Sequence, residues 1–190
     1  MNRRVVAVCA VVILATMPLL LPEFYVTLLN YIGLASIVTI GLVLLTGVAG
    51  LTSFGQAAFV GIGAYTTAVF TTAYGLSPWL TLPISLLLTT AIALVLGFVT
   101  LRLSGHYLPL GTIAWGISIF FVFGNLEILG KYSGIADIPA LSIFGISLSD
   151  GRQFYYPIWL TTLAALLATR NLLDSRVGRA IAKLPARLNN

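Results

Sequence analysis

The feature that most constrains this chain is a run of 78 residues, 24–101, that contains no Asp, Glu, Lys or Arg. A water-soluble domain could not place so long an uncharged segment, because charged and polar residues cover much of a soluble surface. The hydrocarbon core of a bilayer is about 30 Å thick, and a helix needs about 20 apolar residues to cross it. The run alone therefore predicts about three crossings.

The composition of the whole chain agrees with a membrane protein. Hydrophobic residues make up 59% of the sequence and charged residues 8%, and the mean hydropathy is +1.04. Stretches such as residues 84–96 are apolar on every side, whereas barrel strands alternate apolar and polar residues. The predicted fold class is therefore all-α, a polytopic transmembrane helical protein. No groove of basic and aromatic residues indicates a nucleic-acid partner.

Six apolar segments can be drawn, over residues 5–21, 24–47, 56–74, 79–101, 107–125 and 154–169. We expect about six membrane segments with both the N- and C-termini cytoplasmic. The expected cytoplasmic side then holds most of the basic residues: Arg3, Arg4, Arg102, Arg170, Arg176, Arg179, Lys183 and Arg187. The outer side holds Lys131 and Arg152, so the topology follows the positive-inside rule. The first segment is long for a signal sequence and lacks a cleavage site, so we expect an uncleaved span.

A glycine-rich stretch interrupts the helical pattern. Residues 46–65 contain five glycines, and each costs about 1 kcal/mol relative to alanine inside a helix. We expect a broken or re-entrant region here, and broken helices often form the substrate site of transporters. The candidate substrate-pathway residues are Ser53, Gly55, Gln56, Gly61, Gly63 and Tyr65. The alternative is a tight cytoplasmic turn over residues 47–55, with a helix from Gln56 whose small residues let its neighbours approach closely.

The residue types needed for chemistry are scarce. Catalysis needs convergent titratable groups, yet Glu23, Glu127, Asp137, Asp150 and Asp174 fall at the ends of segments or in loops. His106 and Cys9 are interpreted as a loop residue and a small buried side chain. No phosphate-binding loop and no metal-ligand set is present, so we predict no enzymatic activity, no metal and no cofactor.

Several motifs follow one another along the chain. Residues 41–47 read GLVLLTG, residues 50–59 GLTSFGQAAF and residues 61–65 GIGAY. Residues 101–108 read LRLSGHYL, residues 134–139 GIADIP and residues 175–180 SRVGRA. This series resembles the branched-chain amino-acid permeases of ATP-binding cassette importers, over roughly residues 33–182.

The resemblance implies a multi-pass subunit of the bacterial inner membrane with several partners. These would be a second permease subunit, cytoplasmic ATP-binding subunits, a periplasmic solute-binding protein and the lipid bilayer. The solute would be leucine, isoleucine, valine or a related small polar molecule. Permeases of urea and short-amide importers resemble the same family, so the solute stays open at this point.

The C-terminal end departs from the family pattern. The family continues into a coupling loop with a glutamate and a glycine, whereas residues 181–190 read IAKLPARLNN. We therefore expect a truncated or frameshifted product, and a noncatalytic scaffold or assembly fragment is the alternative. The predicted organisation is a transmembrane permease domain over residues 1–170, incomplete relative to the family, and a basic cytoplasmic tail over residues 171–190. Arg176, Gly178 and Arg179 are assigned to cytoplasmic coupling or contact with anionic lipid.

Residues 126–153 form the one sizeable segment expected outside. We hypothesise that this segment packs across the outer mouth and meets the solute-binding protein. A plain connecting loop is the alternative.

Overall fold

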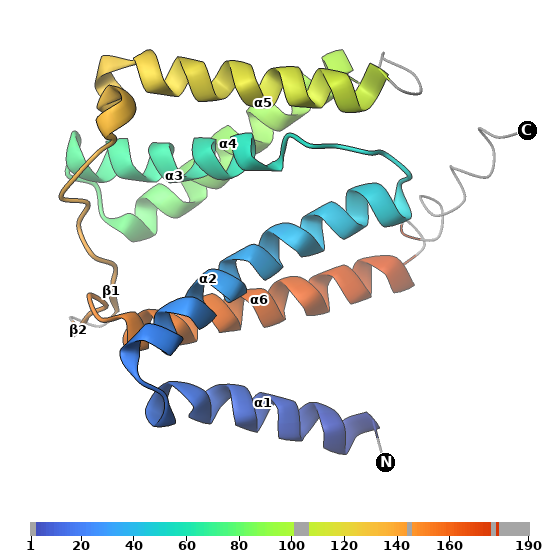
Figure 1. Cartoon of the computed structure of the whole chain (residues 1–190), viewed down its shortest axis with the longest axis vertical. Coiled ribbons are helices and arrows are strands. Elements are labelled where there is room, and N and C mark those ends of the chain that lie inside the picture. Colours follow the sequence, from blue (N-terminus) through green and yellow to red (C-terminus); the bar gives the residue numbers. More distant parts are fainter. Residues whose placement is uncertain (1–2, 101–106, 144–145, 176–177, 179–190) are drawn as a thin grey trace, which may run out of the picture. The chain divides into compact units, whose positions relative to one another are not determined.

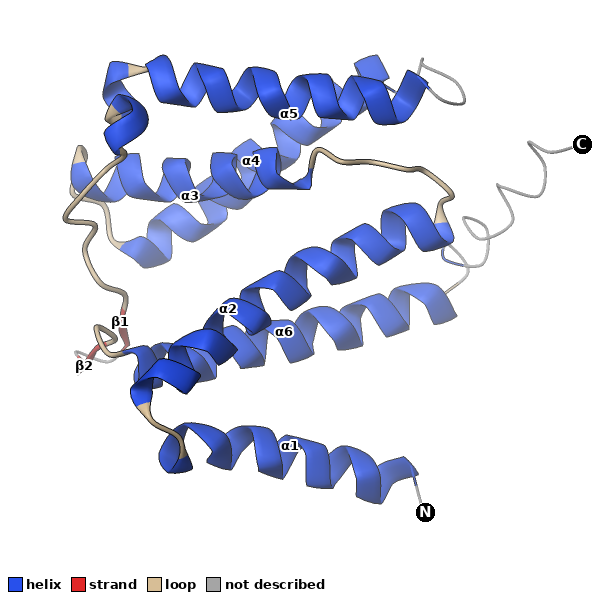
Figure 2. Ribbon diagram, in the orientation of Figure 1, coloured by secondary structure: helices blue, strands red, loops and turns tan. Residues whose placement is uncertain are grey.

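The computed structural model describes residues 3–100, 107–143, 146–175 and 178, and this part is mainly helical (Figure 1) (Figure 2). Its elements are α1 (Arg3–Leu20), α2 (Glu23–Leu42), the π-helix η1 (Val43–Val48), α3 (Gln56–Thr72), α4 (Pro78–Thr100), α5 (Tyr107–Asn125), the 3-10 helices η2 (Glu127–Leu129) and η3 (Lys131–Ser133), the paired strands β1 (Ser142–Ile143) and β2 (Ile146–Ser147), and α6 (Gly151–Asp174). An α-helix lies at each of the six apolar segments, so the helical class is confirmed.

Among the described residues, three helical stretches are long and apolar enough to cross a membrane. They are Glu23–Val48, Pro78–Thr100 and Tyr107–Asn125, with 26, 23 and 19 residues. The 17 residues of α3 span only about 26 Å at 1.5 Å per residue, slightly less than a typical hydrocarbon core. The chain is thus a membrane protein with three supported spans, while crossings by α1, α3 and α6 and the cytoplasmic termini stay predictions.

The predicted break in the glycine-rich stretch is confirmed. The helix that begins as α2 ends as η1 at Val48, and α3 begins at Gln56. Gly50 adopts a left-handed φ of +68°, and the N–H of Leu51 donates to the carbonyl of Leu45 at 3.0 Å. This ending resembles a Schellman motif, in which a hydrogen bond closes the helix around a left-handed residue. Here the hydrogen bond reaches one residue further back along the chain, because the last turn is π-helical. The residue at which α3 starts is the one that the tight-turn interpretation predicts.

The described residues belong to two compact units. The terminal unit comprises residues 1–44 and 146–190, and the central unit comprises residues 45–145. In the terminal unit α2 packs along α6, and α1 joins them (Figure 1). Val26, Tyr155 and Ile158 are buried there.

Close approach and polar contacts hold α2 against α6. A Cβ at Gly33 would lie 2.6 Å from Cγ2 of Ile158, so only glycine fits without a shift. The hydroxyl of Thr162 donates to the carbonyl of Gly33 at 3.2 Å. Nδ2 of Asn30 donates to the carbonyl of Gly151 at 2.8 Å, so a side chain of α2 pairs with the first residue of α6.

Helix α1 is attached to α6 through its backbone carbonyls. The hydroxyl of Tyr155 donates to the carbonyl of Leu14 at 2.8 Å. The guanidinium of Arg152 donates to the carbonyl of Leu21 at 3.2 Å, just after α1 ends. The Asp150 side chain accepts a hydrogen bond from the N–H of Arg152 and caps α6.

In the central unit α3 packs against both α4 and α5. The hydroxyl of Ser85 on α4 donates to the carbonyl of Gly63 at 3.1 Å. On the α5 side, the rings of Tyr65 and Phe123 meet edge to face, with centroids 4.9 Å apart. Small residues on α3 thus admit a neighbour on each side, as the tight-turn interpretation expects.

The segment after α5 folds back onto this unit. A Cβ at Gly124 would overlap the ring of Tyr132, so the tyrosine rests directly on the last turn of α5. The indole N–H of Trp79, in the first turn of α4, donates to the carbonyl of Ser142 at 2.6 Å. The expected outer segment is therefore attached to both helices, and its contact with a solute-binding protein stays a prediction.

Candidate functional site

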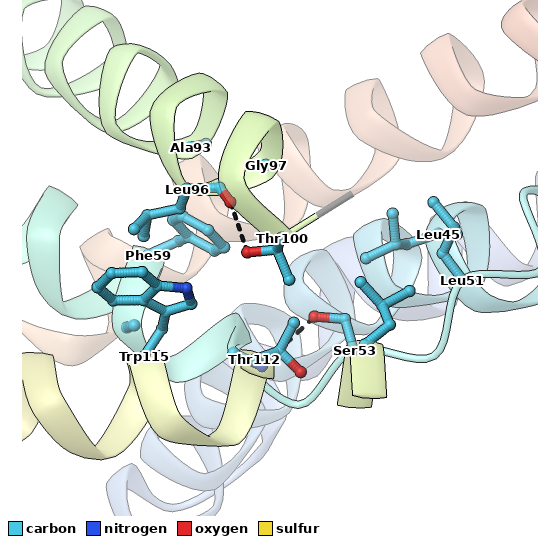
Figure 3. Close-up of a pocket in the computed structure, with 13 residues that line it drawn as sticks. Leu45, Leu51, Ser53, Phe59, Ala93, Leu96, Gly97, Thr100, Thr112 and Trp115 are labelled. Atoms are coloured by element: carbon cyan, nitrogen blue, oxygen red, sulfur yellow. Dashed lines mark hydrogen bonds between the residues drawn. The ribbon is translucent and has the colours of Figure 1, made fainter. Parts of the chain in front are cut away.

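The central unit contains a pocket of about 240 Å³ between α4, α5 and the start of α3 (Figure 3). Aliphatic and aromatic side chains form most of its wall, and three hydroxyl groups interrupt this lining. We call it the hydroxyl pocket; it is lined by Leu45, Leu51, Ser53, Gly55, Ala58, Phe59, Ala93, Leu96, Gly97, Thr100, Leu108, Thr112 and Trp115.

Thr112 joins the extended segment before α3 to α5. Its hydroxyl donates to the carbonyl of Pro109 at 2.9 Å and accepts from the N–H of Phe54 at 3.0 Å. Because a hydroxyl has one proton and two lone pairs, these two hydrogen bonds use the proton and one acceptor position of Thr112. A Cβ at Gly55 would lie 3.3 Å from the carbonyl oxygen of Thr112, so the glycine lets the segment lie against the helix.

The other two hydroxyls come from buried residues. Oγ of Ser53 accepts a long hydrogen bond of 3.4 Å from the N–H of Gly55, which leaves its proton free to donate. The hydroxyl of Thr100 donates to the carbonyl of Leu96 in the preceding turn of α4, which leaves its acceptor lone pairs. The lining therefore combines mainly apolar side chains with three hydroxyl groups (Figure 3).

A second pocket, of about 270 Å³, lies between α3, α5 and η3. We call it the tyrosine pocket; its lining is Ala57, Ala58, Gly61, Tyr65, Gly116, Ile119, Phe120, Phe123, Gly124, Lys131 and Tyr132. It differs from the hydroxyl pocket in having two phenols and an ammonium group. Ala58 borders both pockets, so they follow one another along α3.

Four of the predicted pathway residues lie in the linings of the two pockets. Ser53 and Gly55 line the hydroxyl pocket, whereas Gly61 and Tyr65 line the tyrosine pocket. Whether these four residues contact a solute stays a prediction.

The other two candidates lie elsewhere in the central unit. Gly63 faces α4, where its Cβ position is 3.5 Å from Oγ of Ser85. Gln56 is half-buried at the first position of α3 and is in neither described pocket lining. Their assignment to the pathway remains a prediction.

Sequence reasoning missed Thr100, Thr112, Trp115, Lys131 and Tyr132. A signal existed for the threonines, since α4 and α5 are consecutive and joined by only residues 101–106. The end of one such helix lies near the start of the next, which places Thr100 close to Thr112. The two residues of η3 gave no such signal, because their position depends on how the segment folds back.

The predicted tail residues are only partly described. Arg176, Arg179 and His106 lie outside the described residues, and so does the side chain of Cys9. The N–H of Gly178 donates to Oγ of Ser175 at 3.1 Å, and a Cβ at Gly178 would overlap the carbonyl of Leu172. Helix α6 continues to Asp174, four residues past the predicted domain boundary at residue 170, and the tail's role stays a prediction.

The described residues contain no group of three or more His, Cys, Asp or Glu that could hold a metal ion. Lys131 is in the lining of the tyrosine pocket, and its ammonium forms an ion pair with Glu127 at 2.8 Å. What the described pockets offer is hydrogen bonding, one ammonium and apolar surface.

Comparison with known proteins places most of the chain, including both pockets, within one family of membrane transport components. Residues 24–184 match a family described as the branched-chain amino acid transport system / permease component. The chain is 40% identical over 114 residues to the high-affinity branched-chain amino acid transport system permease protein LivM of Escherichia coli (strain K12), an alignment that covers 60% of this chain and 27% of that protein.

The corresponding LivM protein of Salmonella typhimurium (strain LT2) is 38% identical over 118 residues, which is 62% of this chain and 28% of that protein. The chain thus spans less than a third of the length of these curated relatives. No solved structure matches the chain. The resemblance found in the motifs is confirmed, and the relatives are transport permease components rather than enzymes.

Proposed function

Because the chain belongs to the family of branched-chain amino acid transport permease components, we propose that it forms part of the membrane pathway of an ATP-driven importer for these amino acids. It acts in the bacterial inner membrane and crosses it several times. Its partners are a second permease subunit, ATP-binding subunits and a solute-binding protein. ATP is hydrolysed by the partners, since this sequence has no phosphate-binding loop.

The observation that carries the proposal is the hydroxyl pocket within the matched region. A pocket for a small molecule has mostly apolar walls and a few polar groups that orient the ligand. Ser53, Thr100 and Thr112 supply such groups, and leucine and phenylalanine side chains supply the wall. An aliphatic amino acid has the same division into an apolar side chain and a polar backbone.

The pocket favours an aliphatic amino acid over urea or a short amide. Urea has polar atoms on every edge, and each would lose a hydrogen bond to water against an apolar wall. An unpaired buried polar group costs about 1–3 kcal/mol. A branched aliphatic side chain has no such groups, and its contact with the wall is favourable.

Thr100 and Thr90 provide a matched test on one helix. Both donate a hydrogen bond to the carbonyl four residues earlier, but Thr100 is buried in the pocket and Thr90 is exposed. Valine keeps the shape and removes the hydroxyl. If Thr100 accepts a hydrogen bond from the solute, Thr100→Val should raise the KM for leucine uptake up to about 10-fold, the equivalent of one hydrogen bond.

The assay is uptake of radiolabelled leucine by cells that lack their own leucine importers and express this chain with its candidate partners. Thr90→Val should leave uptake unchanged. Equal uptake by both variants would place the pocket outside the pathway, and no leucine-dependent uptake by the unmodified complex would refute the proposed function itself.

A further inference from the structure

Lys131 in the lining of the tyrosine pocket has an acidic partner, Glu127, next to it. Nζ of Lys131 lies 2.8 Å from Oε1 of Glu127, and the two side chains are 55% and 85% exposed. An exposed ion pair contributes only about 0–1 kcal/mol, so a ligand can separate it at little cost. The ammonium has three donor positions, of which this pair uses one.

The backbone fixes the position of this pair. Gly130 and Lys131 both have left-handed φ values, +72° and +54°. A lysine rarely adopts this conformation, and it persists only where the surrounding contacts impose it. Here the N–H groups of Gly130 and Lys131 donate to the carbonyls of Glu127 and Leu126 at 3.0 and 3.1 Å.

The neighbouring residue anchors the same turn to α5. The ring of Tyr132 rests on Gly124 and lies 6.3 Å, centroid to centroid, from the ring of Phe120. Lys131 is therefore held beside the pocket rather than on a free loop.

The rest of the pocket is suited to an apolar group. Tyr65 and Phe123 form one aromatic wall, and the absence of a side chain at Gly61 keeps space in front of it. A Cβ at Gly61 would lie 3.2 Å from Cε2 of Phe123. The volume of about 270 Å³ is just below the range of about 300–1,000 Å³ typical of ligand pockets, which indicates a ligand smaller than most drugs.

We infer that the tyrosine pocket binds an aliphatic α-amino acid as the zwitterion, with Lys131 on its carboxylate, Glu127 on its ammonium and the aromatic wall on its side chain. The two charges of an α-amino acid sit on one carbon atom, so they need a cation and an anion that are close together. This inference rests on the proposed function and adds the site at which the charged head group is recognised. Among the described residues, those that line the hydroxyl pocket are all uncharged, so we assign the recognition of the charged head group to the tyrosine pocket.

The test is direct binding to the purified full chain in detergent, with three probes that share one carbon skeleton. Leucine has both charges, isocaproate lacks the ammonium and isoamylamine lacks the carboxylate. We expect leucine to bind more tightly than either of the other two. Lys131→Gln should weaken leucine binding by up to about 5-fold, which corresponds to the upper value for one exposed ion pair.

Glu127→Gln should change the affinities for leucine and for isocaproate in opposite directions. It should weaken leucine binding, because the ammonium loses its partner. The same variant should strengthen isocaproate binding, because Lys131 is released from Glu127 and the repulsion between two carboxylates is removed. A purely structural role of the ion pair would change both probes in the same direction.

Arg152→Gln is the matched control. Arg152 is also a cation near the expected outer side, but it belongs to the terminal unit and donates to the carbonyl of Leu21. It should leave the Kd of leucine unchanged, and size-exclusion elution of each variant should match the unmodified chain.

The inference is overturned if leucine binds and both variants keep its Kd, or if the chain does not bind leucine. The proposed function is decided separately by leucine uptake in the assembled complex. Uptake without an effect of Lys131→Gln would leave the proposed function in place and remove the head-group site.

Discussion

Replacing Gly33 with alanine should weaken the contact between α2 and α6. The new Cβ would lie 2.6 Å from Cγ2 of Ile158 and 3.5 Å from the indole of Trp159. Cγ2 is a methyl branch on the Cβ of Ile158, so it cannot move away unless the side chain changes its rotamer. The two helices would have to move apart, and this would lengthen the 3.2 Å hydrogen bond from Thr162 to the carbonyl of Gly33.

The size of the effect follows from a comparison with Gly41 on the same helix. Alanine has a helix propensity about 1 kcal/mol better than glycine, and this gain applies at both positions. A Cβ at Gly41 meets nothing within 4 Å, so Gly41→Ala should be more stable than the unmodified chain by up to about 1 kcal/mol. Overpacking costs about 1–3 kcal/mol, so Gly33→Ala should fall below Gly41→Ala by that amount.

The measurement is the free energy of unfolding in mixed micelles, titrated with a denaturing detergent and followed by circular dichroism. Ile158→Leu removes the branch methyl and keeps the volume, so it should restore much of the stability of Gly33→Ala. Equal stability of the two glycine variants, or no rescue by Ile158→Leu, would refute the packing argument.

Two further substitutions test the central unit. Thr112→Val removes the acceptor for the N–H of Phe54. Hydrogen-exchange mass spectrometry should then show the amide of Phe54 exchanging about 5-fold faster, which corresponds to the loss of about 1 kcal/mol. Unchanged exchange would contradict the role of this contact. Gly124→Ala should displace the ring of Tyr132 from α5 and speed chymotrypsin cleavage after Tyr132. Gly116→Ala on the same helix is the control, because a Cβ there meets nothing within 4 Å and cleavage should not change. Equal cleavage of both variants would show that the position of the ring does not depend on Gly124.

The helices could be predicted from the sequence because their signal is local. An uninterrupted apolar run needs no knowledge of its neighbours, and the glycines of residues 46–65 mark a break by their own conformational freedom. The π-helical turn of η1 could not be predicted, since an apolar stretch reads the same whether its last turn is α or π.

The candidate site was harder to predict because it depends on which helix faces meet. Gly61 and Gly63 are two residues apart, yet they face α5 and α4 respectively. Gly55 lies in the hydroxyl pocket, so the glycine-rich motif contributes to three different environments. Thr100 and Lys131 enter the two pockets only through contacts between elements distant in sequence.

The order of the elements along the chain, with residues 45–145 inserted between α2 and α6, has a consequence for biosynthesis. Asn30 and its partner Gly151 are 121 residues apart, and at about 5–20 residues per second a ribosome needs about 6–24 s to make the chain between them. During that interval the amide of Asn30 lacks the carbonyl that it bonds in the finished protein, and an unsatisfied polar group in lipid costs several kcal/mol. The nascent α2 therefore needs water, an insertase or another helix beside Asn30 until α6 emerges, and the contact between α2 and α6 forms only after residues 45–145 have been made.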